Sequence, residues 1–364
     1  MQYLQTLLYS GKNLKPLIKI LDVYEDNIYD RLFFPQKKGW LGGDAGCSIR
    51  LDKKKTLWLF GDTILGEYKN GRRNVLYPHI NNSIALTTAG HDEKLATEFY
   101  WREKNGLPVS FFTKAFKEKN IYFWPTNGLL IEKTLFIFCY VVKGNFDGNY
   151  LEFWETIDTE LIIVKNPLDD PQGWVMDFIP LGLGNDKFGF HSALFYKKPD
   201  IYFIGYTTNQ SSTKNAFLAV ANSKTIIKNR SISSLKYYNI KTNKFDNQMS
   251  LIDNYNLFSP GNTESSLYYL KRKKIFICTT YDPLSGELSI MTSKKINGPW
   301  LGPQLVFKNP DHITMTYSFR IHPSLSYDEN SIVMSFITSP DKDIRHDAVN
   351  QKYYRPRFLR MDIE

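Results

Sequence analysis

The sequence predicts an all-β protein with the architecture of a five-bladed β-propeller. Of its 364 residues, 42% are hydrophobic and 15% aromatic, which favours strands and allows a large buried core. A hairpin-like unit recurs five times along the chain, and each copy is followed by another strand-like segment. Internal repetition of this kind is typical of radial repeat folds, which protect the edges of their sheets.

Each hairpin unit consists of an apolar segment, a short polar turn and a second segment rich in β-forming residues. The five copies begin at Gly43, Pro125, Phe190, Thr263 and Ile321. The strand-like segments that follow them begin at Asn81, Glu160, Ala216, Glu287 and Arg357. Three or four strands per copy form one blade. A β-sandwich or two small β-domains is the alternative, but five hairpins in the same phase do not suit it.

The chain divides into an N-terminal lead-in, residues 1–40, which we expect to pack on the propeller, and a single propeller domain, residues 41–364. Its start lacks the basic segment of a signal peptide, and no stretch reaches the ~18 apolar residues of a membrane span. We therefore expect a cytoplasmic protein that does not contact membranes. Cys47, Cys139 and Cys278 lie far apart in apolar segments, which predicts buried free thiols.

The net charge of +9 accompanies a general richness in Lys, Asn and Ile, so it does not predict a nucleic-acid partner. Basic runs at 53–55, 197–198 and 271–274 fall in first hairpin turns, where solvated charge is common. The sequence contains no Gly-rich phosphate loop, zinc-binding Cys/His spacing or nucleophile elbow. We expect neither a cofactor nor a metal ion, and the oligomeric state stays open.

One polar residue stands at an equivalent position in each of the five hairpin units. Alignment of the units on a small residue brings together Asp44, Thr126, His191, Glu264 and His322. Because the first strand of a propeller blade faces the central channel, we expect these side chains to line one mouth of that channel. Ordinary solvated strand starts are the alternative.

A second aspartate lies close to the first in the predicted sheet. A hairpin centred near Lys53 places Asp44 directly opposite Asp62. Directly opposed residues have Cβ atoms ~4.5–5.5 Å apart, and two carboxylates at that separation repel, which raises one pKa. The alternative is that Asp62 accepts backbone hydrogen bonds at the end of its strand.

The segment that carries these aspartates, GGDAGCSIRLDKKKTLWLFGDTILG, resembles a known family, as do the later INNSIALTT and WPTNGLLI. The family consists of five-bladed β-propellers formerly described only as a domain of unknown function, and it is associated with endo-D-arabinanases. The matching motifs are Asp-Xaa-Gly-Xaa-Ser (Asp44, Gly46, Ser48) and Phe60-Gly61-Asp62-Thr63. The resemblance is specific over residues 40–90. It implies a glycoside-hydrolase-like site with Asp44 and Asp62 as the catalytic carboxylates.

Other residues complete the candidate site. Glu264 is a candidate auxiliary acid or substrate ligand. Trp124 could stack on a sugar ring, because the CH-rich face of a sugar packs well on indole. The remaining candidates for binding substrate hydroxyls or a phosphate group are Asn82, Asn127, His191, Arg320 and His322. Each also has a structural alternative, as a core residue, a turn residue or the partner of a carboxylate.

The function that these features predict is hydrolysis of a glycosidic bond in a carbohydrate substrate, with a furanosidic bond favoured. A directly paired Asp44 and Asp62 would approach the ~5–5.5 Å carboxyl separation of retaining glycosidases. An intracellular glycoside phosphorylase or sugar transferase is one alternative, with phosphate held by His191, His322 and Arg320. A non-catalytic glycan-binding propeller is the other.

Overall fold

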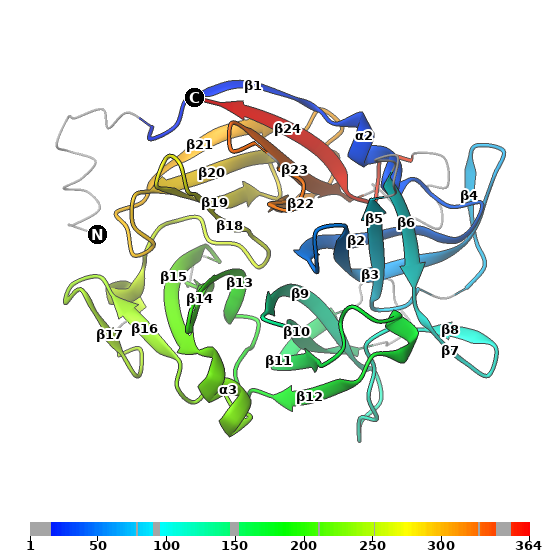
Figure 1. Cartoon of the computed structure of the whole chain (residues 1–364), viewed down its shortest axis with the longest axis horizontal. Coiled ribbons are helices and arrows are strands. Elements are labelled where there is room, and N and C mark those ends of the chain that lie inside the picture. The colour runs from blue at the N-terminus through cyan, green and yellow to red at the C-terminus, as the bar shows by residue number, and fades with distance from the viewer. Residues whose placement is uncertain are drawn as a thin grey trace.

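A computed structural model describes residues 16–77, 79–89, 95–145, 153–209, 212–250, 252–326, 328–339 and 351–364. Five antiparallel sheets of four or five strands stand around a central axis, as Figure 1 shows. The predicted five-bladed β-propeller is confirmed. In the described part of the chain, no helix has the length and apolar character needed to cross a membrane.

Strands follow one another outward from the axis in blades one to four. Blade one contains β2 (Lys38–Arg50), β3 (Lys55–Lys69), β5 (Ser83–Ala89) and β6 (Leu95–Tyr100), with β4 (Arg72–Val75) beside β3. Blade two contains β9 (Ile121–Ile131), β10 (Thr134–Asn145), β11 (Phe153–Val164) and β12 (Met176–Pro180). Blade three contains β13 (Phe188–Lys197), β14 (Asp200–Thr208), β15 (Lys214–Asn222), β16 (Lys236–Asn239) and β17 (Lys244–Asp246). Blade four contains β18 (Leu267–Leu270), β19 (Ile275–Asp282), β20 (Glu287–Ser293) and β21 (Leu301–Lys308).

Short elements connect the blades or cover their rims. The α-helices are α2 (Asn27–Asp30) and α3 (Ser223–Asn229). The 3-10 helices are η1 (Arg31–Phe33), η2 (Pro171–Gly173) and η3 (Ile252–Tyr255). A separate hairpin, β7 (Arg102–Lys104) and β8 (Leu107–Val109), follows blade one.

The two ends of the described chain meet in blade five, which closes the ring. Its strands, from the axis outward, are β22 (Thr316–Ile321), β23 (Ser331–Thr338), β24 (Arg357–Ile363) and β1 (Ile20–Glu25). Figure 1 shows β1 along the outer side of β24. Ion pairs reinforce this pairing: Arg355 donates two hydrogen bonds to the Asp30 carboxylate, at 3.0 and 2.8 Å, and Arg360 donates to Asp26 at 2.7 Å. The segment before residue 40 therefore supplies the outer strand of blade five.

Apolar side chains fill the spaces between neighbouring blades. Between blades one and two, Cys47 and Cys139 belong to one buried cluster, while Cys278 lies in the cluster between blades three and four. All three cysteines are buried and free, which confirms the prediction. Because each blade packs on two neighbours, burial at one inner strand depends on strands distant in sequence.

The inner strand of blade five lies earlier in the chain than the sequence predicts. We expected it to begin at Ile321, but β22 ends there, and residues 322–325 lead into a turn. The buried Leu325 gives this turn an apolar pattern like that of a strand. The true strand β22 was not recognised because it lacks a regular alternating pattern: its register with β23 shifts between Tyr317 and Arg320.

Candidate active site

Asp44 lies on the inner strand of blade one at an interruption in the pairing of β2 with β3. The register shifts between Gly43 and Ala45, so Asp44 faces Gly61 together with Asp62. Ala45 takes a left-handed backbone conformation with φ 66°, as expected at a β-bulge. Gly43 pairs with Thr63, as the hairpin arithmetic requires, but the bulge places Gly61 opposite Asp44 as well, which arithmetic on a regular hairpin cannot detect. The two aspartates are nevertheless neighbours across the strands.

The Asp44 carboxyl group is tightly enclosed. Its Oδ2 accepts a hydrogen bond from the Tyr317 hydroxyl at 3.1 Å. Its Oδ1 lies so near Gly61 that a Cβ atom there would be 2.5 Å away. Burial raises the pKa of Asp44 well above its ordinary value, and the nearby negative charges of Asp62 and Glu264 raise it further. This environment favours a protonated carboxylic acid.

The environment of Asp62 is different, because nitrogen donors face it. Trp124 Nε1 donates to Oδ1 at 2.9 Å, and Asn81 Nδ2 lies 3.4 Å from the same oxygen. Such donors stabilise a negative charge. The indole of Trp124 packs edge-on against Trp154, with ring centroids 4.8 Å apart, and lies 5.8 Å from Tyr122. Since Trp154 is 50% exposed, these three rings form an aromatic wall that reaches solvent beside Asp62.

Glu264, which precedes β18, is the third carboxylate near Asp44. Its side chain is 15% exposed, and its Oε1 lies 3.4 Å from Nη2 of Arg320. Burial raises the pKa of Glu264, while the Arg320 guanidinium acts in the opposite direction. Asp62 and Glu264 thus both act on Asp44, and all three carboxylates are only partly buried.

Arg320 joins three blades and is not available to a substrate. It comes from blade five, is 1% exposed, and donates to the backbone carbonyl of Ser265 in blade four at 2.7 Å. It also donates to the carbonyl of Thr126 in blade two at 3.0 Å. Its Nε lies 3.4 Å from Ser318 Oγ. The proposed substrate-binding role is therefore corrected to a structural one, in which Arg320 also balances the charge of Glu264.

His191 and His322 do not line the channel mouth, contrary to the prediction. Both rings are fully buried, and both pKa values are lowered to about 3, chiefly by burial. Both histidines are therefore neutral at physiological pH. The hydroxyl groups that contact their ring nitrogens belong to Thr126 and Thr159 for His191, and to Ser48 and Ser335 for His322. These contacts are structural, and all of them except that between His322 and Ser335 join different blades.

Replacement of His322 by Gln should reduce the loss of stability on acidification. In the unfolded chain this histidine binds a proton below its ordinary pKa of about 6.5, whereas the folded protein excludes that proton down to about pH 3. The contribution of His322 to the free energy of unfolding is therefore fully present above about pH 6.5, and it is lost as the pH decreases below that value. Each such histidine contributes a slope approaching about 1.4 kcal/mol per pH unit. Urea unfolding at pH 7, 6 and 5 measures it, and equal slopes in both proteins would contradict the buried neutral histidine.

The two predicted asparagines also have structural roles. Asn82 is fully buried; its amide nitrogen donates to the carbonyls of Phe112 and Phe123, and its oxygen accepts from the Phe112 amide. Asn127 donates to the carbonyl of Ser192 at 2.6 Å and so ties blade two to blade three. Their proposed contacts with substrate are therefore corrected, because these hydrogen bonds hold the amides to neighbouring chain segments.

Sequence reasoning did not identify Tyr317 or Trp154. Tyr317 escaped because the inner strand of blade five was assigned too late in the chain. An alignment of blade five on Arg320 as the end of its inner strand could have found it. Trp154 lies in the polar stretch GNYLEFWETIDTE, where a large aromatic residue has little reason to be buried. A tryptophan in so polar a stretch indicates an exposed aromatic side chain, and this could have identified Trp154 from the sequence.

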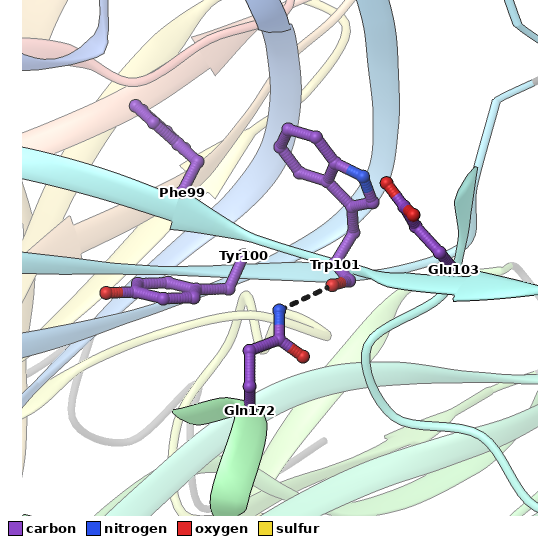
Figure 2. A pocket seen from close by; sticks show the side chains of 5 residues that line it. All are labelled: Phe99, Tyr100, Trp101, Glu103 and Gln172. Carbon is purple, nitrogen blue, oxygen red and sulfur yellow. Dashed lines mark hydrogen bonds between the residues drawn. The ribbon is translucent and has the colours of Figure 1, made fainter. Parts of the chain in front are cut away.

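A separate groove of about 320 Å³ lies at the rim, away from the carboxylates. Figure 2 shows the side chains that line it, and Gln172 Nε2 donates to the carbonyl of Trp101 at 3.0 Å. The lining residues are Phe99, Tyr100, Trp101, Glu103 and Gln172. They come from the outer strand of blade one, the residues that follow it, and η2 in blade two. Asp44 and Asp62 lie on inner strands of blade one instead.

The fold and the site define a five-bladed propeller with three carboxylates and an aromatic wall beside its inner strands. Within the described ranges, no group of three or more His, Cys, Asp or Glu side chains is arranged to hold a metal ion. The chain belongs to the family described as "Domain of unknown function (DUF5005)", whose family model matches residues 26–362. No curated protein sequence matches the chain significantly.

Solved structures similar to this chain share its fold. A protein described as a "putative hydrolase" from Bacteroides ovatus ATCC 8483 is 17% identical, with a TM-score of 0.69 over 97% of each chain. Zg3597, a family 117 glycoside hydrolase from Zobellia galactanivorans, is 9% identical, with a TM-score of 0.49 over 95% of this chain and 89% of that chain. An α-L-arabinofuranosidase from Lactobacillus brevis is 10% identical, with a TM-score of 0.48 over 94% and 92%.

Proposed function

We propose that the protein is a glycoside hydrolase that uses Asp44 and Asp62 as its catalytic carboxylates. The observation that carries this proposal is the contrast between the two groups. Asp44 is partly buried, with its pKa raised by burial and by neighbouring carboxylates, whereas Asp62 accepts hydrogen bonds from Trp124 and Asn81. Two nearby carboxyl groups with such different hydrogen-bond partners and burial suit acid and base roles.

Asp44 is the proton donor in this mechanism, and Asp62 is the nucleophile. Asp62 attacks the anomeric carbon while Asp44 gives its proton to the glycosidic oxygen, so the leaving group departs as a neutral alcohol. Asp44 then removes a proton from water, which attacks the anomeric carbon and releases Asp62. Two displacements give net retention of configuration. The partly exposed Glu264 serves as a substrate ligand or an auxiliary acid.

A neutral sugar is the substrate class that suits this charge distribution. Asp62 and Glu264 both lie near enough to Asp44 to raise its pKa, and the donors of Arg320 are engaged by backbone carbonyls and by Glu264. An anionic sugar would meet net repulsion here. The furanosidic part of the proposal rests on the resemblance of residues 40–90 to the family associated with endo-D-arabinanases. The fold shared with the putative hydrolase from Bacteroides ovatus also supports hydrolysis.

The phosphorylase alternative loses its support, because none of its three proposed phosphate ligands is available. His191 and His322 are buried and neutral, and Arg320 is buried and engaged. Inorganic phosphate binds preferentially to accessible cations and free N–H donors. Hydrolysis therefore suits the site better than phosphorolysis.

Proton NMR of the first-formed product tests the proposal. The wild-type protein and Asp62→Asn should be incubated with arabinofuranose-containing and xylose-containing oligosaccharides, each with and without inorganic phosphate. We expect a phosphate-independent product with retained anomeric configuration from the wild type alone. An inverted product would exclude the nucleophilic role of Asp62, and a glycosyl phosphate would favour the phosphorylase. Glycan binding without product would favour a non-catalytic propeller.

Replacement of Trp154 by Ala should weaken substrate binding with little effect on turnover. Its exposed ring extends the aromatic wall beyond Asp62, and a stacking contact contributes about 0.5–1.5 kcal/mol. We expect KM to rise by about 2- to 12-fold while kcat stays within 2-fold. Steady-state kinetics measures both constants. Tyr24→Ala, an equally simple truncation of an exposed ring on β1, is the control, and equal KM values for the two variants would contradict the aromatic wall.

A further inference from the structure

The carboxyl group of Asp44 is held between two residues from different strands. Tyr317 of β22 donates its hydroxyl hydrogen to Oδ2 at 3.1 Å. On the other side, Gly61 of β3 leaves the space that Oδ1 occupies, since a Cβ at that position would stand 2.5 Å from Oδ1. The two oxygens of one carboxyl group therefore have different surroundings.

Contacts between blades five and one hold Tyr317 in place. Its neighbour Ser318 takes a left-handed backbone conformation, with φ 52°, and donates a hydrogen bond from Oγ to the backbone carbonyl of Ala45. Ala45 directly follows Asp44 in the chain. Strand β22 is thus fixed to the bulge in β2 next to the point where the Tyr317 hydroxyl reaches Asp44. The backbone of Tyr317 is therefore held in place, which helps to fix the hydrogen bond between Tyr317 and Asp44.

We propose that Tyr317 and Gly61 are positioning residues that hold the acidic proton of Asp44 on Oδ1. The carbonyl oxygen of a carboxylic acid is a better hydrogen-bond acceptor than its hydroxyl oxygen. Because Oδ2 accepts the Tyr317 hydrogen, Oδ2 is the carbonyl oxygen and Oδ1 carries the proton. Oδ1 is also the oxygen on the side of Gly61, the residue that directly precedes Asp62 in the chain. The use of this proton in glycosidic cleavage rests on the proposed function, whereas its position on Oδ1 does not.

Among the described residues, the ionisable groups that act on Asp44 and Tyr317 each shift the pKa in a defined direction. Asp62 and Glu264 raise the pKa of Asp44, as burial does, and the Tyr317 hydrogen bond lowers it. Burial and the charges of Asp44, Tyr354 and Glu264 keep the pKa of Tyr317 well above its ordinary value. The Tyr317 hydroxyl therefore stays protonated and remains a donor across the physiological pH range.

Tyr317→Phe tests the hydrogen bond. Loss of the donor removes stabilisation of the ionised Asp44, so Asp44 should hold its proton to higher pH. We expect the alkaline limb of the kcat/KM profile to move to higher pH and kcat to fall by about 10-fold. The control is Tyr238→Phe, which removes a buried tyrosine hydroxyl that donates to Asn243 in blade three. It should leave the limb in place. A Tyr317→Phe limb that coincides with the wild-type limb would overturn the role of Tyr317.

Gly61→Ala tests the space. The atom that a new Cβ would meet is the end of the Asp44 side chain, so the carboxyl group should move while the backbone stays. We expect near-normal unfolding and a fall in kcat of about 10²-fold, in line with the effect of a displaced catalytic group. The matched control is Gly173→Ala, which adds a methyl group in open space and should leave activity unchanged. Gly71→Ala would not serve, because the backbone of Gly71 has a positive φ that strains any other residue. Full activity of a folded Gly61→Ala would overturn the role of Gly61.

Titration of Asp44 by carboxyl ¹³C NMR separates this inference from the proposed function. The Asp44 signal is assigned by its absence in Asp44→Asn, and its midpoint is compared in the wild type, Tyr317→Phe and Tyr238→Phe. A higher midpoint in Tyr317→Phe alone supports the hydrogen bond even if no sugar is cleaved. Equal midpoints in all three would overturn it even if hydrolysis is found.

Discussion

Replacement of Asp62 by Asn is expected to lower kcat by about 10³-fold or more, because Asp62 is the nucleophile in the proposed mechanism and an amide is a far weaker one. The amide has nearly the same shape, and its oxygen can still accept the hydrogen bond from Trp124 Nε1. Binding of substrate along the aromatic wall should therefore remain. Single-turnover kinetics and calorimetric binding to the same oligosaccharide separate these two effects.

A matched control for Asp62→Asn is Asp22→Asn on β1, at the outer edge of blade five. It makes the same chemical change far from the inner strands and should leave turnover unchanged. Activity within 10-fold of the wild type in a folded Asp62→Asn protein would exclude Asp62 as the nucleophile. Loss of activity together with loss of the fold would instead be visible in its unfolding curve, and Asp62→Glu would then test the site, since it keeps the charge.

Replacement of Arg320 by Met is expected to destabilise the protein by about 3–5 kcal/mol, the usual cost of removing one partner from a buried ion pair. The guanidinium contacts backbone carbonyls of Ser265 and Thr126 as well as the carboxylate of Glu264. Its loss leaves these acceptors without their donor and leaves Glu264 without its countercharge. Urea unfolding at pH 7 measures the change in free energy.

A double variant separates the charge of Arg320 from its packing. Glu264→Gln removes the uncompensated carboxylate, so adding it to Arg320→Met should recover part of the lost stability. Arg320→Lys keeps the charge but loses the planar fork that reaches several carbonyls, and it should lie between wild type and Arg320→Met. A loss below about 1 kcal/mol in Arg320→Met would contradict the bridging role, because exposed ion pairs contribute that little.

The strands and their division into blades were predictable because β-strand patterns are local. Alternating or continuous β-formers on either side of a polar turn identify a hairpin whatever surrounds it. Asp44, Asp62 and Trp124 were found for the same reason, since each lies at a defined point of a hairpin or strand start. The structure brings Asp62 and Trp124 into contact and places Asp44 beside them.

The roles of the other polar residues depend on burial, which only the tertiary structure decides. His191, His322, Asn127 and Arg320 contact residues from other blades, and Asn82 contacts segments about 30 and 41 positions away. A polar side chain at an inner strand looks the same in sequence whether it faces solvent or another blade. Its hydrogen-bond partners lie far along the chain, so no local pattern records them.

The sequence by itself determined the propeller and the first hairpin of blades one to four, and it pointed to the two aspartates of the candidate site. The tertiary structure decided the bulge at Asp44, the start of β22 and the contact of Tyr317 with Asp44. Bulges and contacts between blades depend on how strands fit against neighbours that are remote in sequence. The physical reason is that strand formation follows from the alternation of adjacent side chains, whereas the protonation and accessibility of a carboxyl group follow from everything packed around it.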